Sequence, residues 1–352
     1  MDKASRNRQR IQKLTLLMQG KATMLIVMQD HPDPDAIASA AALRQLGNTF
    51  AGVACTLARG SNAVRAENQA LIKYLGLNFR LLANVDISRF DLIAMVDTQP
   101  GTGNNPLPAD VVPDIVFDHH PIRRTTRRCK FTDVRSKYGA TSSILFEYLS
   151  QAEIKPETPL ATALLYGIRS DTQDLGRETT QADIDAYLAL YPLGNKRMLS
   201  RIEHATVPLA YFQVLANALA NALVIGKGIF SNVGNVDNPD MLGEVADLLL
   251  RGEDCAWSLC CGIHQEQILL SLRTVDLTAK AGVVMHRLVG RSGTGGGHST
   301  LAGGQIPLKK GTEAEGNHIM RMIQKRFIAF LKAKDAEPER LVQRKRRPGI
   351  EP

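Results

Sequence analysis

The first half of the chain alternates short apolar runs with longer segments of helical periodicity. The strand-like runs cover residues 24–28, 52–57, 92–96 and 115–117. The segments with helical periodicity cover residues 35–46, 64–75, 138–149 and 159–168. Short apolar runs separated by helical patterns indicate βα units. We therefore predict an α/β domain with a mostly parallel sheet and helices on both faces.

The second half predicts a smaller α/β domain. Residues 180–222 are mostly helical in pattern, and we interpret 194–215 as a helical linker. Beyond the linker the pattern predicts strands at 223–233, 257–263 and 268–273, and helices at 241–250, 278–288 and 312–334. A chain of 352 residues is expected to hold two domains. We place the first at 1–193, the second at 216–335 and a basic tail at 336–352.

Acidic residues and histidines follow four of the apolar runs in the first half. They are His31, Asp33 and Asp35 after the first run, then Asp97, then Asp118, His119 and His120, and finally Asp171. Ligands of open α/β sheets bind at the carboxyl ends of the strands, so we expect these side chains to meet at one edge. Carboxylates and imidazoles together are ligands for divalent cations. The pattern predicts a two-metal hydrolase that acts on phosphate esters, with Asp97 as the bridging carboxylate.

Each of these residues also has a purely structural interpretation. Asp33 or Asp35 could serve as a helix N-cap, and Asp97 could form a turn. Asp171 ends a predicted helix, where a negative charge opposes the helix dipole, and this favours a compensating cation. Because all of these residues occur together, we favour the metal site.

The second half contains one glycine-rich segment of chemical interest, at residues 293–304. Gly295, Gly296, Gly297 and His298 lack the lysine of a P-loop and do not match the dinucleotide-binding pattern. Glycines let backbone N–H groups approach a phosphate or a base closely, although a flexible turn is the simpler interpretation. Arg273 ends a predicted strand and could bind a phosphate in a bidentate manner.

Composition limits the kind of substrate and the cellular compartment that we expect for this protein. The net charge of +8 suits an anionic substrate, although part of the excess lies in the tail at 344–347, which we expect to be solvated. Five cysteines form no CxxC pair, which is typical of a reducing compartment, and we expect a cytoplasmic protein. We find no signal peptide and no apolar stretch of about 20 residues, so no membrane partner is expected.

Taken together, these motifs resemble the DHH/DHHA1 phosphoesterase family of the RecJ-like superfamily. The resemblance covers roughly residues 22–332 and is nearest to the nanoRNase/pAp-phosphatase branch. It rests on Pro32-Asp33-Pro34-Asp35-Ala36, Val96-Asp97-Thr98, Asp118-His119-His120-Pro121, Ser170-Asp171-Thr172, Ser271-Leu272-Arg273 and Gly295-Gly296-Gly297-His298. Members of this branch are manganese-dependent hydrolases. They remove nucleotides or phosphate from short phosphorylated substrates in the cleft between a DHH domain and a DHHA1 domain.

The resemblance implies a role for each residue. Two divalent cations are expected, Mn²⁺ first, with Mg²⁺ or Co²⁺ as alternatives. Asp33 would bind one cation, Asp35 the other, and Asp97 would bridge them. His119 and Asp171 would complete the set, with His120 near the scissile phosphate, so that the catalytic residues are Asp97, His119 and His120. Arg273 and the 295–298 loop would bind the far end of the substrate.

One residue departs from the pattern of this branch. The branch carries a histidine four residues before the first aspartate of the Asp-x-Asp pair, and this chain has Gln29 there. His31, two residues nearer, is the candidate substitute ligand.

Several functions fit these observations. The expected one is hydrolysis of short oligoribonucleotides, linear dinucleotides or 3′-phosphoadenosine 5′-phosphate. Two alternatives keep the fold: an inorganic pyrophosphatase or exopolyphosphatase, and a non-catalytic nucleotide sensor, which Gln29 favours. A nucleic-acid-binding protein acting through its basic tail is a further class. A homodimer is left open as a protein partner.

Overall fold

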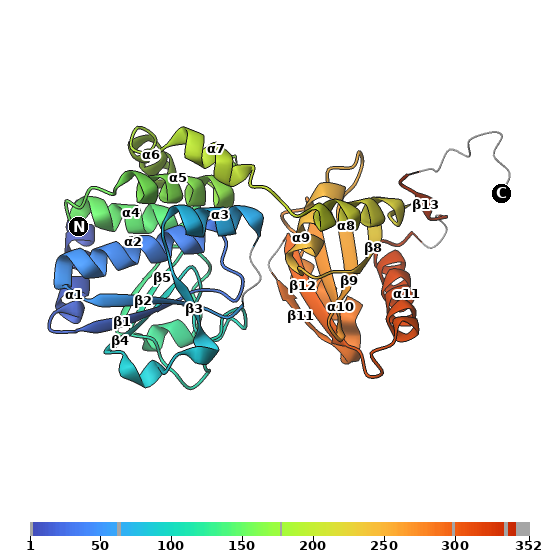
Figure 1. Cartoon of the computed structure of the whole chain (residues 1–352), viewed down its shortest axis with the longest axis horizontal. Helices are drawn as coiled ribbons and strands as arrows, with labels where there is room; N and C mark the ends of the chain where they lie inside the picture. Colours follow the sequence, from blue (N-terminus) through green and yellow to red (C-terminus); the bar gives the residue numbers. More distant parts are fainter. Residues whose placement is uncertain (1–2, 62–64, 177, 298–299, 334–336, 343–352) are drawn as a thin grey trace. The chain divides into compact units, whose positions relative to one another are not determined.

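The computed structural model describes residues 3–61, 65–176, 178–297, 300–333 and 337–342. The chain forms two compact units, residues 1–206 and 207–352, and each is described by itself (Figure 1). No helix among the described residues has the length and apolar character needed to cross a membrane.

The first unit is built on a six-stranded parallel sheet with the strand order β3-β2-β1-β4-β5-β6. Its strands are β1 (Thr23–Val27), β2 (Ala54–Arg59), β3 (Phe79–Leu81), β4 (Leu92–Val96), β5 (Ile115–Asp118) and β6 (Phe131–Val134). In β1, Val27 lies opposite Ala58 of β2 and Met95 of β4. The central strands β1, β4 and β5 are almost wholly apolar because both of their faces are buried.

Helical elements cover both faces of this sheet, but unequally. The α-helices are α1 (Lys3–Met18), α2 (Pro34–Ala51), α3 (Ala66–Tyr74), α4 (Thr141–Gln151), α5 (Thr158–Thr172), α6 (Gln181–Leu190) and α7 (Lys196–Glu203). Figure 1 shows α2, α4 and α5 side by side over one face, where they enclose the larger core. The opposite face is covered by short 3-10 helices and loops, which enclose a smaller core around Val27 and Met95.

Helix α2 carries the first of the acidic motifs, and its ends follow from local sequence. Asp33 is its N-cap, with Oδ1 accepting a hydrogen bond from the N–H of Ala36 at 2.9 Å, and Pro34 occupies the first helical position. The helix ends at Gly52, which has a φ of 65°. The N-terminal cap places the beginning of α2 a short loop after β1, at the carboxyl edge of the sheet.

The region predicted as a helical linker, 194–215, is not one continuous helix. It contains α7, which is packed in the first unit through Leu199 and Ile202, and the first half of α8 (Leu209–Ala220) in the second unit. The residues between them are not helical, since a residue before proline is driven away from the α conformation and Val207 precedes Pro208.

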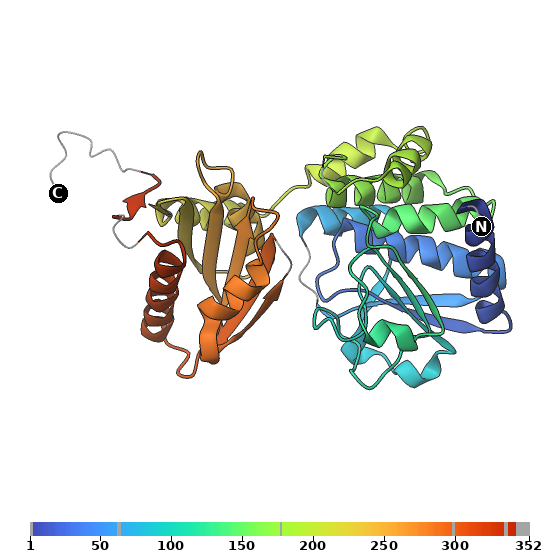
Figure 2. The ribbon, with the colours of Figure 1, turned by 180° about the vertical axis from the view of Figure 1, so that it is seen from behind.

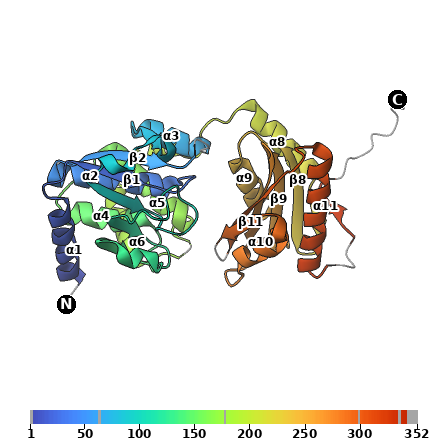
Figure 3. The ribbon, with the colours of Figure 1, turned by 90° about the horizontal axis from the view of Figure 1, so that it is seen from below.

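The second unit contains a seven-stranded mixed sheet with the order β11-β12-β10-β9-β8-β7-β13. The remaining elements are β7 (Leu223–Ile225), β8 (Gly228–Asn235), α9 (Asp240–Leu249), β9 (Trp257–His264), β10 (Gln267–Thr274), α10 (Ala281–Val289), β11 (Thr294–Gly297), β12 (Leu301–Pro307), α11 (Glu313–Phe330) and β13 (Glu339–Arg340). Among the described strands of this sheet, β8 and β9 pair in parallel and the other neighbours are antiparallel. Helices α8 and α9 cover one face, and α10 and α11 cover the other (Figures 2 and 3).

Two sequence predictions for this unit need correction. The single strand predicted at 223–233 is the hairpin of β7 and β8, which turns at Gly226 with a φ of 54°. The glycine-rich segment predicted as a loop forms the antiparallel strands β11 and β12, with Gly296 opposite Gly303. Their glycines permit α10 to pack closely, because a Cβ on Gly304 would lie 2.6 Å from the sulfur of Met285.

Candidate metal centre

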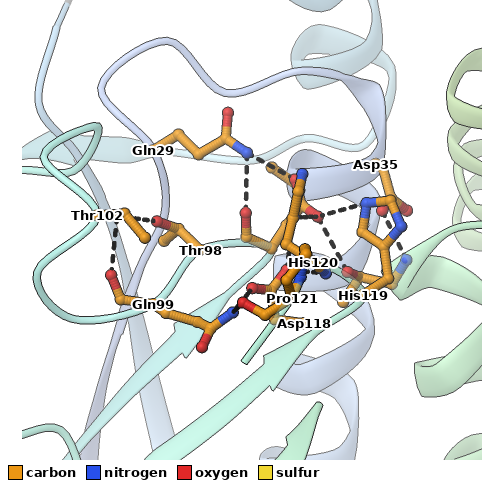
Figure 4. Close-up of polar contacts among 12 residues, drawn as sticks. Gln29, Asp35, Thr98, Gln99, Thr102, Asp118, His119, His120 and Pro121 are labelled. Carbon is orange, nitrogen blue, oxygen red and sulfur yellow. Dashed lines mark hydrogen bonds and ion pairs between the residues drawn. The ribbon is translucent and has the colours of Figure 1, made fainter. Parts of the chain in front are cut away.

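Acidic and histidine side chains from four elements meet at the carboxyl edge of the first sheet (Figure 4). Asp35 lies in the first turn of α2, Asp97 follows β4, His119 follows β5, and Asp171 lies near the end of α5. Each offers one ligand atom, and these four atoms all lie within 4.8 Å of one another. A second, overlapping group on the same criterion is Asp97, His119 and His120.

Asp35 is fully buried and held by the N-terminus of α4. Its Oδ2 accepts a hydrogen bond from the N–H of Thr141 at 2.7 Å, and its Oδ1 accepts one from the N–H of Ser142 at 2.8 Å. Two N–H groups at a helix N-terminus favour a carboxylate. Burial and the charge of Asp171 nevertheless raise the pKa of Asp35 to about 6.

Asp97 is buried and adopts a left-handed backbone conformation, with a φ of 56°. Aspartate tolerates this region better than most residues, so the chain can turn sharply after β4. Its Oδ1 accepts a hydrogen bond from Thr141 Oγ1 at 3.0 Å, and its Oδ2 accepts one from Gln29 Nε2 at 2.7 Å. Burial and the neighbouring carboxylates of Asp33 and Asp35 raise the pKa of Asp97 well above its usual range.

His119 has a defined orientation. Its Nδ1 lies 3.2 Å from the backbone carbonyl oxygen of Tyr138, which only accepts, so Nδ1 carries the proton. Its Nε2 then faces Asp171 Oδ2 at 3.1 Å and Asp97 Oδ1 at 3.5 Å. Burial disfavours the charged ring, but the carboxylates of Asp171 and Asp35 outweigh it and raise the pKa of His119 to about 10.

His120 is held by the carboxylate that precedes the histidine pair. Asp118 Oδ1 lies 2.8 Å from His120 Nδ1, and Asp118 Oδ2 accepts a hydrogen bond from Gln99 Nε2 at 2.6 Å. Burial opposes the charge of Asp118, but the hydrogen bond and charge of His120 keep its pKa below the usual range. Gln99 Oε1 accepts a hydrogen bond from the N–H of Arg123, so the side chain of Gln99 links the loops that follow β4 and β5.

Asp33 and His31, two of the predicted ligands that follow β1, lie outside both groups. Asp33 caps α2 through one oxygen, and burial together with Asp171 and Asp35 raises its pKa to about 7. His31 is exposed, and among the described residues it joins neither group of metal-binding side chains. Gln29 of the same loop donates hydrogen bonds to Asp97.

The donor set fits a divalent cation. Burial, and after it the repulsion between neighbouring carboxylates, raises the pKa values of Asp33, Asp35 and Asp97, and a cation would offset both effects. The buried His119 Nε2 has no hydrogen bond of acceptable geometry within the described chain. Oxygen ligands with one imidazole suit Mn²⁺ or Mg²⁺ better than a thiolate-preferring metal.

The predicted substrate-binding residues lie at one end of the second sheet. Arg273 on β10 is in register with Leu301 on β12, and Gly297 on β11 is in register with Ala302. The Arg273 guanidinium donates from Nε to Asp247 Oδ1 at 2.7 Å and from Nη1 to Ser271 Oγ at 2.9 Å. Gly295 and Gly296 lie in β11, whereas His298 is outside the described residues.

Sequence reasoning missed the residues that orient the ligands. Thr141 and Ser142 bind Asp35 from more than a hundred positions away, and Tyr138 orients His119 through its backbone carbonyl. The sequence signal that could have found them was the small-residue run Gly139–Ser143 before a helical pattern, which is typical of a helix N-terminus.

Comparison with known protein families agrees with this geometry. Residues 23–168 match the family described as "DHH family, N-terminal domain". This part of the chain is therefore similar to a DHH domain. It contains β1 to β6 and three of the four clustered ligands, while Asp171 follows it by three residues.

Two curated relatives of this chain come from Methanocaldococcus jannaschii. Uncharacterized protein MJ1633 is 38% identical over 290 residues, which cover 82% of this chain. The chain spans 59% of the length of that relative. Uncharacterized protein MJ0988 is 24% identical over 341 residues, covering 88% of this chain and 96% of the relative.

Solved structures share the fold. An exopolyphosphatase-related protein from Bacteroides fragilis is 18% identical with a TM-score of 0.70, covering 92% of this chain and 98% of its own. RecJ from Thermus thermophilus, in complex with Mn²⁺, is 12% identical with a TM-score of 0.51, covering 94% of this chain and 54% of its own. At these identities the likeness concerns the fold alone.

Proposed function

We propose that this protein is a metal-dependent phosphoesterase of the DHH family. The observation that carries the proposal is the group of buried Asp35 and Asp97 with half-buried His119 and Asp171, whose ligand atoms lie within 4.8 Å of one another at the carboxyl edge of a parallel sheet. Divalent cations bound there would polarise a phosphoryl oxygen and lower the pKa of a bound water.

Neighbouring residues of the protein orient the side chains that would bind the cations and the phosphate. Thr141 and Gln29 hold the two oxygens of Asp97, and the Tyr138 carbonyl fixes the tautomer of His119. Such outer contacts orient metal ligands and raise their basicity. Asp118 Oδ1 holds the His120 ring through Nδ1, which leaves Nε2 for a hydrogen bond to a phosphate oxygen in the transition state.

We propose short phosphorylated nucleotides as the substrates, namely short oligoribonucleotides, linear dinucleotides or 3′-phosphoadenosine 5′-phosphate. The support is the resemblance to the nanoRNase/pAp-phosphatase branch, together with Arg273 and the glycine strands of the second unit. A phosphoanhydride substrate, such as pyrophosphate or polyphosphate, is the second candidate, favoured by the structural likeness to an exopolyphosphatase-related protein.

Hydrolysis of a small substrate panel tests this proposal. The panel contains a 5′-phosphorylated RNA dinucleotide, 3′-phosphoadenosine 5′-phosphate, pyrophosphate and a short polyphosphate, each with and without Mn²⁺. We expect metal-dependent turnover of a nucleotide, and its loss in Asp97→Ala while the thermal unfolding transition is retained. Turnover that persists in Asp97→Ala would contradict the assignment, and cleavage of the phosphoanhydrides alone would select the second candidate.

A further inference from the structure

The two carboxylate oxygens of Asp97 have different partners. Oδ1 faces Thr141 Oγ1 and His119 Nε2, inside the group of four ligands. Oδ2 accepts a hydrogen bond from Gln29 Nε2 at 2.7 Å, and the same nitrogen donates to the Asp97 backbone oxygen at 2.8 Å. Figure 4 shows Gln29 on the opposite side of the drawn cluster from His119. The two oxygens of the Asp97 carboxylate therefore have different surroundings.

The other metal-binding side chains also gather on one side of Asp97, the side of Oδ1. The Oδ1 side brings together Asp35, Asp97, His119 and Asp171. The first-motif residues Asp33 and His31 join no comparable group within the described chain, and one Asp33 oxygen is already used to cap α2. A bridging carboxylate gives its second oxygen to a second cation, and here the Gln29 amide N–H already takes one of the two lone pairs of that oxygen.

We propose that Gln29 makes the two metal positions of this protein unequal. One cation binds tightly through Asp35, Asp97, His119 and Asp171. The second binds weakly, because the Gln29 amide competes for Asp97 Oδ2 and offers at most a neutral oxygen where an imidazole would be a stronger ligand for a transition metal. The second cation then binds together with the phosphate groups of the substrate, as Mg²⁺ commonly does. This inference rests on the proposed function.

Counting the Mn²⁺ ions that bind to the metal-free protein tests the inference without any assay of activity. We expect isothermal titration calorimetry and equilibrium dialysis to give one tight Mn²⁺ per chain. Electron paramagnetic resonance should show the signal of an isolated ion rather than of a coupled pair. In Gln29→His we expect the second ion to bind about tenfold more tightly or better, the usual effect of a ligand-level change, with coupling between the two ions.

Gln29→Ala is the matched control, since it removes the amide donor without supplying a ligand. We expect it to keep the tight ion and to lack a tight second ion. Two tight ions in the wild-type protein would overturn the inference and leave the proposed function intact. So would a folded Gln29→His variant that still binds only one. Absence of tight Mn²⁺ from every variant would instead overturn the metal centre itself. The number of tightly bound Mn²⁺ ions in the wild-type protein tests the inference even if Gln29→His does not fold.

Discussion

At the scale of single residues, folding forces carboxyl groups into positions where their charge is unfavourable. Burial, with the charges of Asp171 and Asp35, raises the pKa of Asp33 to about 7, and burial with Asp171 raises that of Asp35 to about 6. Both groups have an ordinary pKa near 3.8. The folded, metal-free protein therefore binds more protons than the unfolded chain between these values.

This predicts how stability depends on pH. The contribution of these carboxyl groups is fully present below about pH 4 and is lost as the pH rises through 6 and 7, by at most about 1.4 kcal/mol per pKa unit. We expect the melting temperature of the metal-free protein to fall as the pH rises from about 4 to about 7. Mn²⁺ should raise the melting temperature more at the higher pH, because protons and cations compete for the same oxygens.

Asp33→Asn is the control for this prediction, measured by differential scanning calorimetry. Asparagine is an equally good N-cap but does not titrate, so the variant should keep α2 and show a shallower dependence on pH. An unchanged slope in Asp33→Asn would show that the pH dependence comes from other groups.

Residue types and their positions along the chain were enough to predict Asp35, Asp97, His119, His120 and Asp171 as candidates, and the structure brings these five together in two overlapping groups. They could be predicted because each follows a buried run, and the carboxyl ends of parallel strands share one edge. The role of Gln29 could not be predicted, since it depends on the loop geometry that turns Gln29 toward Asp97.

At the scale of elements, the ligands depend on how closely α2 and α5 approach each other. A Cβ built on Gly167 of α5 would lie 2.6 Å from Ser142 Oγ and 3.1 Å from the Cα of Asp35. Glycine is there for space, because alanine would otherwise stabilise the middle of a helix by about 0.5–1 kcal/mol.

Gly167→Ala should therefore weaken metal binding. We expect the affinity for Mn²⁺ to fall about tenfold or more, because the added methyl group displaces Asp35 or Ser142. Gly47→Ala in α2 is the matched control, since the nearest atoms to its Cβ would be the ends of the Cys55 and Met24 side chains at 3.0 and 3.1 Å. Calorimetric titration with Mn²⁺ measures both, and equal affinities in the two variants would show that the α2–α5 contact does not position Asp35.

The elements themselves were predictable to different degrees. The apolar strands β1, β4 and β5 and the helices α2, α5, α9 and α11 follow directly from their patterns, because burial on both faces or on one stripe leaves a clear period. Strands β11 and β12 could not be predicted from glycine-rich sequence. There the close packing of α10 against the sheet overrides the low strand propensity of glycine.

At the scale of the whole molecule, we assign metal binding to the first unit and propose recognition of the substrate by the second. Arg273 carries the clearest test of this division, since hydrogen bonds from its guanidinium group to Asp247 and Ser271 hold it in place. A charged hydrogen bond contributes about 1.5–3 kcal/mol, which corresponds to roughly 10- to 100-fold in affinity.

We therefore expect Arg273→Gln to raise the KM for a nucleotide substrate by about tenfold or more, with the Mn²⁺ affinity unchanged. Steady-state kinetics and metal titration on the same preparation measure the two quantities. A fall in Mn²⁺ affinity, or an unchanged KM, would contradict the division of roles between the two units.

The decisive question is whether phosphoester hydrolysis depends on a metal bound by this particular cluster. The measurement is mononucleotide release from the 5′-phosphorylated RNA dinucleotide as Mn²⁺ is titrated into the metal-free protein and its Asp97→Ala variant. We predict that turnover rises as Mn²⁺ binds to the wild-type protein and is lost in the folded variant. Turnover without metal, or equal turnover in Asp97→Ala, would show that this cluster is not the catalytic metal centre.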